Sequence, residues 1–144
     1  MRNFFLKCQP LSADFAALLL RLLFGVLFIW YGWMKIDGYD KYIGMMPDYL
    51  GIGSRLSYNL VIFAEFFCGI LVALGILTRL SVIPIIFSMI IVFFVALKAQ
   101  TFEQRQLPFV FLVMGVIIFI MGSGRFSIDY LFKKTKPSAE RRMV

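Results

Sequence analysis

Residues 58–77 read YNLVIFAEFFCGILVALGIL, a nearly unbroken apolar segment that carries one acid, Glu65, close to its middle. A helix of this length rises about 30 Å, the thickness of the hydrocarbon core of a bilayer. An ionised side chain at that depth costs at least about 2.5 kcal/mol, so it normally faces the protein interior and has a partner. The segment therefore predicts a membrane-spanning helix with a buried polar site.

Three further segments have the same character, and the expected spans cover residues 15–33, 58–77, 80–97 and 107–121. Of the 144 residues, 61% are hydrophobic, which is more than a soluble domain of this size can bury. The segments are too long and too continuously apolar for the alternating strands of a barrel. We expect an all-α integral membrane protein, with one four-transmembrane-helix bundle over residues 1–132 and a basic, disordered cytoplasmic tail over residues 133–144.

The connections differ in length and composition. The first external loop, residues 36–56, mixes tyrosine and methionine with charged residues, which is typical of a segment that lies in the membrane interface. It is either a gate for a ligand or an anchor that closes the outer end of the bundle. The second and third spans are joined only by Thr78 and Arg79, so they are antiparallel neighbours. After the fourth span, Ser127 predicts the cap of a short amphipathic helix over residues 128–133.

The basic residues are distributed unevenly between the two sides of the membrane. The side of both tails and the 78–79 connection carries Arg2, Lys7, Arg79, Arg125, Lys133, Lys134, Lys136, Arg141 and Arg142, against Lys35, Lys41, Arg55, Lys98 and Arg105 on the other. This excess places both termini in the cytoplasm. The net charge of +7 is thus mainly a topology signal, and a nucleic-acid partner is not expected.

The residue types that usually hold redox centres are scarce. There is no histidine, which excludes bis-histidine haem ligation and ordinary zinc sites. The two cysteines, Cys8 and Cys68, are far apart in the sequence and form no CxxC motif. We expect no metal, no structural disulfide and no intrinsic cofactor, although a quinone is compatible with the chain.

The two buried charges, Arg21 and Glu65, form the candidate site. Counted along their helices, Arg21 lies about 10 Å and Glu65 about 20 Å from the cytoplasmic boundary, an offset that a long arginine side chain largely covers. We therefore expect an ion pair between them, with Cys68 one turn from Glu65 on a similar face. The pair either fixes the register of two helices or acts on a ligand, for example a quinone carbonyl. Glu65 is either ionised or protonated, because burial disfavours the charged form.

Small residues recur where helices would meet. Gly25 and Gly32 in the first span, and Gly69 and Gly75 in the second, are expected to pack helices closely, because small side chains let backbones approach in lipid.

Three motifs carry a family resemblance. The first span has the spacing R-x3-G-x2-F-x3-G-x2-K over residues 21–35, the second reads A-E-x2-C-G-x5-G-x2-T-R over residues 64–79, and residues 122–129 read GSGRFSID. Together they resemble the DoxX family of small four-span membrane proteins over residues 16–131. Cys68 stands where the family usually has glycine, and Ser123 where it usually has proline.

The resemblance implies a broad range of functions. Members are described as membrane subunits of redox systems, including a thiosulfate:quinone oxidoreductase and an oxidative-stress complex with soluble enzymes, and distant relatives resemble cargo receptors. Carried over by position, the residues of interest are Arg21, Lys35, Glu65, Thr78, Arg79, Ser127 and Asp129. The ones expected at membrane boundaries are Lys35, Thr78, Arg79, Ser127 and Asp129. Asp129 is expected to reach Arg79 and so to link the last segment to the helical hairpin.

The leading hypothesis is a protein of the bacterial inner membrane that serves as an accessory membrane subunit of a quinone-linked redox complex. The catalytic centre would lie on a soluble redox partner at the cytoplasmic face, and the chain would not be an enzyme on its own. The alternative is a non-enzymatic binder or transporter of a lipid or small amphiphile, or a membrane assembly factor. Besides the lipid bilayer, the expected partners are a quinone or lipid ligand and a second copy of the chain.

Overall fold

The computed structural model describes residues 13–135, with side chains for residues 13–132. Four helical spans in this part of the chain are long and apolar enough to cross a membrane. They are α1 (Ala13–Asp37); Ser54–Leu74, made of α3 (Ser54–Ile62), a π-helical turn η1 (Phe63–Phe67) and α4 (Cys68–Leu74); Thr78–Ala96, made of α5 (Thr78–Ile91) and a second π-helical turn η2 (Val92–Ala96); and α6 (Phe102–Met121). No strand occurs among residues 13–135. The prediction of an all-α, four-span bundle is confirmed.

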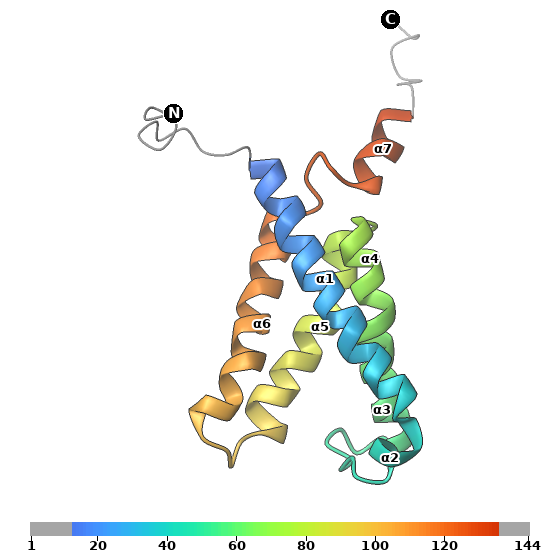
Figure 1. Cartoon of the computed structure of the whole chain (residues 1–144), viewed down its shortest axis with the longest axis vertical. Coiled ribbons are helices and arrows are strands. Elements are labelled where there is room, and N and C mark those ends of the chain that lie inside the picture. The colour runs from blue at the N-terminus through green and yellow to red at the C-terminus, as the bar shows by residue number, and fades with distance from the viewer. Residues whose placement is uncertain (1–12, 136–144) are drawn as a thin grey trace, which may run out of the picture.

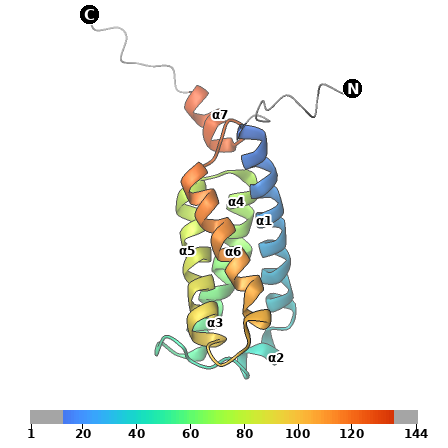
Figure 2. The same ribbon diagram turned by 90° about the vertical axis from the view of Figure 1, so that its left-hand side faces the viewer.

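The bundle has two distinct ends (Figures 1 and 2). At one end, called here the terminal end, α1 begins, α4 turns into α5, α6 stops and the last helix, α7 (Ile128–Thr135), follows. At the other, called here the loop end, lie the short helix α2 (Tyr39–Ile43), the connection to α3 and the connection between the third and fourth spans. Most of the tail expected from residue 133 onward lies outside the described residues.

The core of the bundle is apolar and lies between its two ends. Nine buried side chains form it: Phe24, Phe28, Cys68, Val72, Val82, Ile85, Met89, Phe111 and Ile118. The ring of Phe111 on α6 contacts that of Phe28 on α1, with centroids 5.0 Å apart. The exposed side chains of the spans are also largely apolar, as a surface in contact with lipid requires.

The contact between α1 and the second span is unusually close because both helices present glycines. A Cβ atom on Gly25 would lie 2.7 Å from Cβ of Ala73, and one on Gly32 would lie 2.6 Å from the backbone nitrogen of Phe66. A Cβ on Gly69 would lie 3.2 Å from Cβ of Phe28. The three glycines therefore fix the distance and the register of these two helices.

The turn between the second and third spans lies earlier than expected. The sequence analysis placed it at Thr78 and Arg79, but α4 ends at Leu74, and Thr78 already begins α5. Gly75 has φ +73°, its N–H donates to the Val72 carbonyl (3.1 Å), and the Ile76 N–H donates to the Leu71 carbonyl (2.9 Å). These two hydrogen bonds form the Schellman motif, which a glycine with positive φ allows at a helix end. Gly75 therefore ends α4, and it also packs closely as expected, since a Cβ there would meet Arg21 of α1 and Ser127.

The loop after α2 is held by one carboxylate. Asp48 accepts hydrogen bonds from the N–H groups of Gly53 (2.8 Å) and Ile52 (3.1 Å) and from the Ser57 hydroxyl (3.3 Å). These bonds, led by that of Gly53, lower the pKa of Asp48 below its ordinary value. The carboxylate therefore fastens the loop to the start of α3 while it is ionised.

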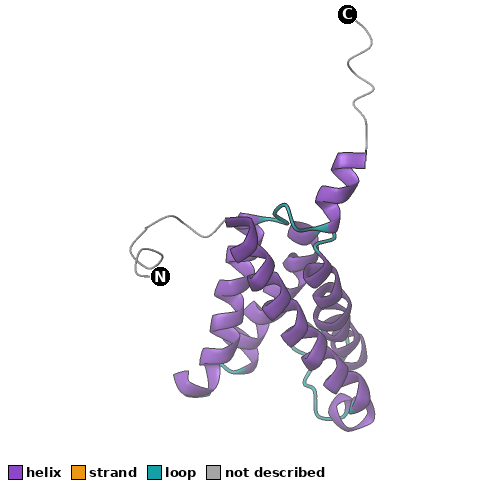
Figure 3. Cartoon of the chain, turned by 45° about the horizontal axis from the view of Figure 1, so that its top comes forward, coloured by secondary structure: helices purple, strands orange, loops and turns teal. Residues whose placement is uncertain are grey.

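The last helix is capped as expected. The Ser127 hydroxyl accepts a hydrogen bond from the Tyr130 N–H (3.2 Å), so Ser127 is the N-cap of α7, which runs to Thr135, two residues beyond the expected end. Figure 3 shows α7 extending away from the four spans at the terminal end. Leu131 and Phe132 are strongly exposed on it, at 62% and 70%, which suits a helix at a membrane surface.

Candidate functional site

Glu65 has a different partner from the one expected. The second-span carboxylate is 2% exposed, and its Oε2 accepts a hydrogen bond from Nζ of Lys35 in the last turn of α1. The predicted ion pair between Arg21 and Glu65 is wrong. A buried carboxylate without a counter-charge would be costly, so Lys35 fills the role that the sequence analysis gave to Arg21.

The glycine contacts explain why the partner differs. Because Gly25 lies against Gly69 and Ala73, and Gly32 lies against Phe66, Glu65 is level with the last turns of α1. Arg21 lies 14 residues before Lys35, which is about 21 Å along the helix. No arginine side chain spans that distance. The depths of Arg21 and Glu65 were counted from the ends of the apolar segments. That count failed because it did not include the register between the two helices, which the glycines set.

The backbone around Glu65 is a π-helical turn. The Cys68 N–H donates to the Phe63 carbonyl, five residues back, so one extra residue is inserted in the second span between α3 and α4. Such single turns inside α-helices are frequent at functional sites. The insertion changes which residues of α3 and α4 share a face, and it leaves Glu65 and Ala64 both buried.

Tyrosines surround the pair at the loop end. The Tyr58 hydroxyl donates to the Lys35 carbonyl (3.0 Å), and the Tyr39 hydroxyl donates to Oδ1 of Asn59 (2.9 Å). The rings of Tyr39 and Tyr58 have centroids 5.4 Å apart. The Tyr58 bond holds the end of α1 against α3, and the Tyr39 contacts hold α2 against α3, so Lys35 stays in reach of Glu65.

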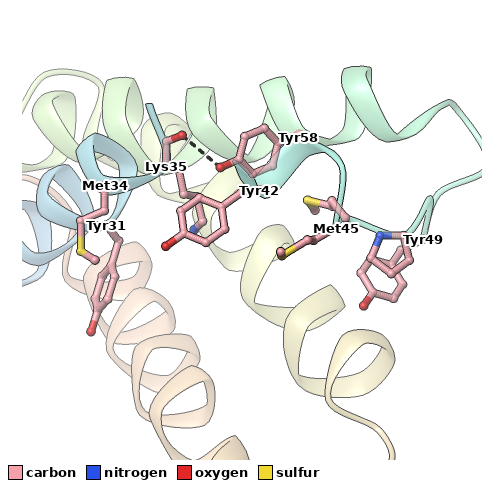
Figure 4. Close-up of a pocket in the computed structure, with 9 residues that line it drawn as sticks. Tyr31, Met34, Lys35, Tyr42, Met45, Tyr49 and Tyr58 are labelled. Atoms are coloured by element: carbon pink, nitrogen blue, oxygen red, sulfur yellow. Dashed lines mark hydrogen bonds between the residues drawn. The ribbon is translucent and has the colours of Figure 1, made fainter. Parts of the chain in front are cut away.

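Lys35 faces a cavity of about 390 Å³, called here the tyrosine pocket. Figure 4 shows that its walls come from the end of α1, from α2, from the loop that follows and from α3. The pocket is lined by Tyr31, Met34, Lys35, Tyr42, Met45, Met46, Pro47, Tyr49 and Tyr58. It combines flat aromatic surface and adaptable methionines with one ammonium group, a composition that suits a flat ligand with a polar edge.

A second cavity of about 470 Å³, called here the apolar cleft, lies between the second and third spans. Met46 and Tyr49 line both cavities, so the cleft adjoins the tyrosine pocket. The cleft is lined by Met46, Tyr49, Leu50, Ser57, Leu60, Val61, Phe63, Ala64, Ile83, Pro84, Phe87, Ser88, Ile91, Val92 and Ala96. Ser88 is 5% exposed, and its hydroxyl has no hydrogen-bond partner among the described residues. The two cavities together offer a polar end and a long apolar space.

Arg21 lies at the other end of the bundle. It is 1% exposed, and its Nη2 donates to the Phe126 carbonyl (2.5 Å) in the segment that leads to α7. The Asp129 carboxylate attracts the guanidinium electrostatically, while Nε and Nη1 have no hydrogen-bond partner in the described part of the chain. Arg21 therefore joins α1 to the terminal segment and does not belong to the site of Glu65.

The remaining predicted residues are divided between these regions. Cys68 is 3% exposed in the apolar core and lines neither the tyrosine pocket nor the apolar cleft, so the expected group of Arg21, Glu65 and Cys68 is not assembled. Asp129 does link the last segment to the hairpin, but its Oδ1 accepts from the Leu77 N–H (2.9 Å), whereas Arg79 donates to the Ile120 carbonyl (3.3 Å). The expected contact between Asp129 and Arg79 is therefore wrong.

The tyrosine pocket was not predicted. The tyrosines and methionines of the loop were expected at the membrane interface, and Lys35 was expected only at the membrane boundary. The signal was present in the spacing of Gly25, Gly32 and Lys35 on one face of α1, since the first two pack against the helix that carries Glu65.

Four apolar helical spans, with a buried carboxylate paired to a partly exposed lysine beside a pocket, define a small multi-pass membrane protein with a polar site inside its bundle. A family model described as DoxX matches residues 16–98, more than half of the chain. The chain belongs to the DoxX family. No curated protein and no solved structure gives a significant match. The matched range includes both residues of the ion pair, and α6 and α7 lie beyond it.

Proposed function

We propose that this DoxX-family protein is the membrane subunit of a redox complex and binds an isoprenoid quinone at the loop end. The head group would occupy the tyrosine pocket, and the isoprenoid chain would lie in the apolar cleft. The observation that carries the proposal is the Lys35–Glu65 ion pair, which places a donor group in a pocket that adjoins a nearly wholly apolar cavity. A ligand with a polar ring and a long hydrocarbon chain matches both spaces.

The chemistry of the pair fits a quinone carbonyl. Lys35 carries three N–H donors, of which one is used by Glu65, so others are available to a carbonyl oxygen in the pocket. Tyr31 and Tyr42 supply aromatic surface for the ring. Reduction of a quinone to a quinol takes two electrons and two protons, one proton on each carbonyl oxygen. Lys35 and Glu65 would hold the ring and pass one proton to the nearer oxygen, water at the mouth of the pocket would supply the second proton to the far oxygen, and the two electrons would come from a redox centre on a partner protein.

The location of the pocket bears on where that partner docks. With both termini in the cytoplasm of a bacterium, as the distribution of basic residues favours, the pocket opens on the outer side of the inner membrane. The electron donor would then dock at the loop end. The redox partner was first expected at the basic terminal end, and that end would instead make a different contact.

The experiment combines ligand identification with binding. Small molecules that copurify with the full chain in mild detergent are identified by mass spectrometry, and a short-chain ubiquinone analogue is titrated against intrinsic fluorescence. Both tryptophans, Trp30 and Trp33, lie on α1 within two turns of Lys35, so a bound quinone should quench them. We expect a copurifying quinone in the wild type and at least about tenfold weaker binding after Lys35→Met, since one charge-assisted hydrogen bond contributes about 1.5 kcal/mol or more.

The matched control is Lys98→Met, which removes the same charge at the loop end outside both cavities. Equal weakening in both lysine variants would contradict the proposed pocket. Because Lys35→Met leaves a buried carboxylate alone, the variant Lys35→Met with Glu65→Leu tests binding in a chain without that cost. Copurification of lipid in place of quinone, with no quenching in any variant, would favour the binder or transporter of a lipid or small amphiphile.

A further inference from the structure

A third cavity lies at the terminal end, outside the site proposed above. It has a volume of about 640 Å³ and lies between the first turn of α5 and the link from α6 to α7. Its walls are residues 77–80, residues 121–124 and Asp129. Thr78 is the first residue of the third span and Met121 the last of the fourth, so the cavity lies at the level where membrane-embedded helices end. That is the level of lipid head groups.

The helix that opens onto this cavity begins without a side-chain cap. Leu77 precedes α5 and makes no capping hydrogen bond with its apolar side chain, and its own N–H is taken by Asp129. The helical span that starts here runs for 19 residues, and the N-terminus of such a helix carries a partial positive charge and free N–H groups. A helix start of this kind favours an anion.

Thr78 gives an independent indication that a ligand belongs here. The residue is 1% exposed, lines the cavity, and its hydroxyl has no hydrogen-bond partner in the described part of the chain. Buried hydroxyl groups are nearly always hydrogen-bonded in native proteins. An oxygen-rich ligand at the helix start would supply the missing partner.

Arg79 provides the positive charge. Its Nη2 donates to the Ile120 carbonyl (3.3 Å), and its guanidinium lies over Gly122, where an added Cβ would be 3.2 Å from Nε. The other guanidinium N–H groups are not engaged by the described side chains. Asp129 is the one acid of the cavity wall, and Arg79 is its one arginine. Arg79 and the partial positive charge of the helix start, against this one carboxylate, leave a net positive site.

We propose that this cavity binds the phosphate group of an anionic phospholipid through Arg79, Thr78 and the first turn of α5. Planar guanidinium groups pair well with phosphate oxygens, and the threonine hydroxyl would donate to one of them. The same chemistry would accept free phosphate, so the test distinguishes the two sources. Bound there, the lipid phosphate would bridge α5 and the link to α7.

The test uses native mass spectrometry of the full-length protein in mild detergent, titrated with phosphatidylglycerol and, separately, with inorganic phosphate. Arg79→Gln should weaken phosphatidylglycerol binding about tenfold, and Thr78→Val should weaken it about threefold. Arg79→Lys, which keeps the charge, should retain most of the binding. Asp129→Asn should strengthen binding, because it removes the only negative charge of the wall and keeps an oxygen that accepts from Leu77.

The matched control is Arg125→Gln, which removes one positive charge at the same end from a side chain that is 76% exposed and lies outside the cavity. It should leave binding within about twofold of the wild type. Competition of inorganic phosphate with the lipid, with the same order of variants, would identify free phosphate as the ligand. Equal loss in Arg79→Gln and Arg125→Gln, or weaker binding by Asp129→Asn, would overturn the site.

Discussion

Substitution by alanine is predicted to be most disruptive at Gly75, which has the closest contact to an added Cβ among the described glycines. Gly75 ends α4 with φ +73°, and a Cβ there would collide with Nη1 of Arg21 and lie 2.7 Å from Cβ of Ser127. To accept the methyl group, Arg21 must move, and its hydrogen bond to the Phe126 carbonyl would break. Gly75→Ala therefore affects the backbone, the packing and a buried charge together.

The magnitude follows from two contributions. A non-glycine residue in the left-handed region costs about 1 kcal/mol, and overpacking a tight contact costs about 1–3 kcal/mol. We expect Gly75→Ala to lower the free energy of unfolding by about 3 kcal/mol. The assay is unfolding by sodium dodecyl sulfate in mixed micelles, followed by circular dichroism, with the thermal midpoint measured by tryptophan fluorescence.

The structure supplies a matched control at Gly51, which has φ +69° but no described atom within 4 Å of an added Cβ. Gly51→Ala should show the backbone cost alone, about 1 kcal/mol. Gly44→Ala, with open space and no positive φ, should cost little. Equal destabilisation by Gly75→Ala and Gly51→Ala would show that Arg21 and Ser127 do not crowd the turn, and would refute the reasoning.

The other predictions concern the ion pair, the loop and α7. Lys35→Met alone should destabilise the protein by about 3–5 kcal/mol, because it leaves the buried Glu65 carboxylate unpaired, and adding Glu65→Leu should restore most of the loss, as measured by unfolding in mixed micelles; no recovery would show that Glu65 does not depend on Lys35. The lowered pKa of Asp48 means that its ionised form is favoured in the folded loop, so its stabilisation is present above the ordinary value of about 3.9 and is lost as the pH falls below it. The amide resonance of Gly53 should therefore titrate with a midpoint below about pH 3.9 and should lose this titration in Asp48→Asn; a midpoint above that ordinary value would be inconsistent with the bonds. Ser127→Ala should destabilise α7 by about 1 kcal/mol and speed its hydrogen exchange, with Ser123→Ala as a control that leaves exchange unchanged.

The number of spans could be predicted because the apolar segments alone determine it. Each of the four is long enough to cross a bilayer, and no soluble arrangement competes with that reading. The cap at Ser127 was also predictable, since the hydroxyl acts on N–H groups within its own turn. Local and compositional signals were thus sufficient for the architecture.

Which residues pair at the site could not be predicted from the ends of the apolar segments. Whether Glu65 meets Lys35 or Arg21 depends on the register between two helices, which Gly25 and Gly32 fix through contacts with residues far away in sequence. The π-helical turn at Glu65 has no reliable sequence signal. Gly75 was predicted to pack closely, but its second role as the end of α4 was missed, because a glycine at a helix end and one inside a helix look alike until the turn is known.

The separation of Arg21 from the Lys35–Glu65 pair has an electrical consequence. Between them lies the apolar core, in which the described side chains offer no chain of titratable groups from one end to the other. An ion or proton taken up at the loop end would have to cross this layer without a solvating partner, which costs several kcal/mol or more. The apolar layer thus separates the two charged regions, and a proton taken up in the proposed quinone chemistry would be exchanged with the compartment on the side of the loop end.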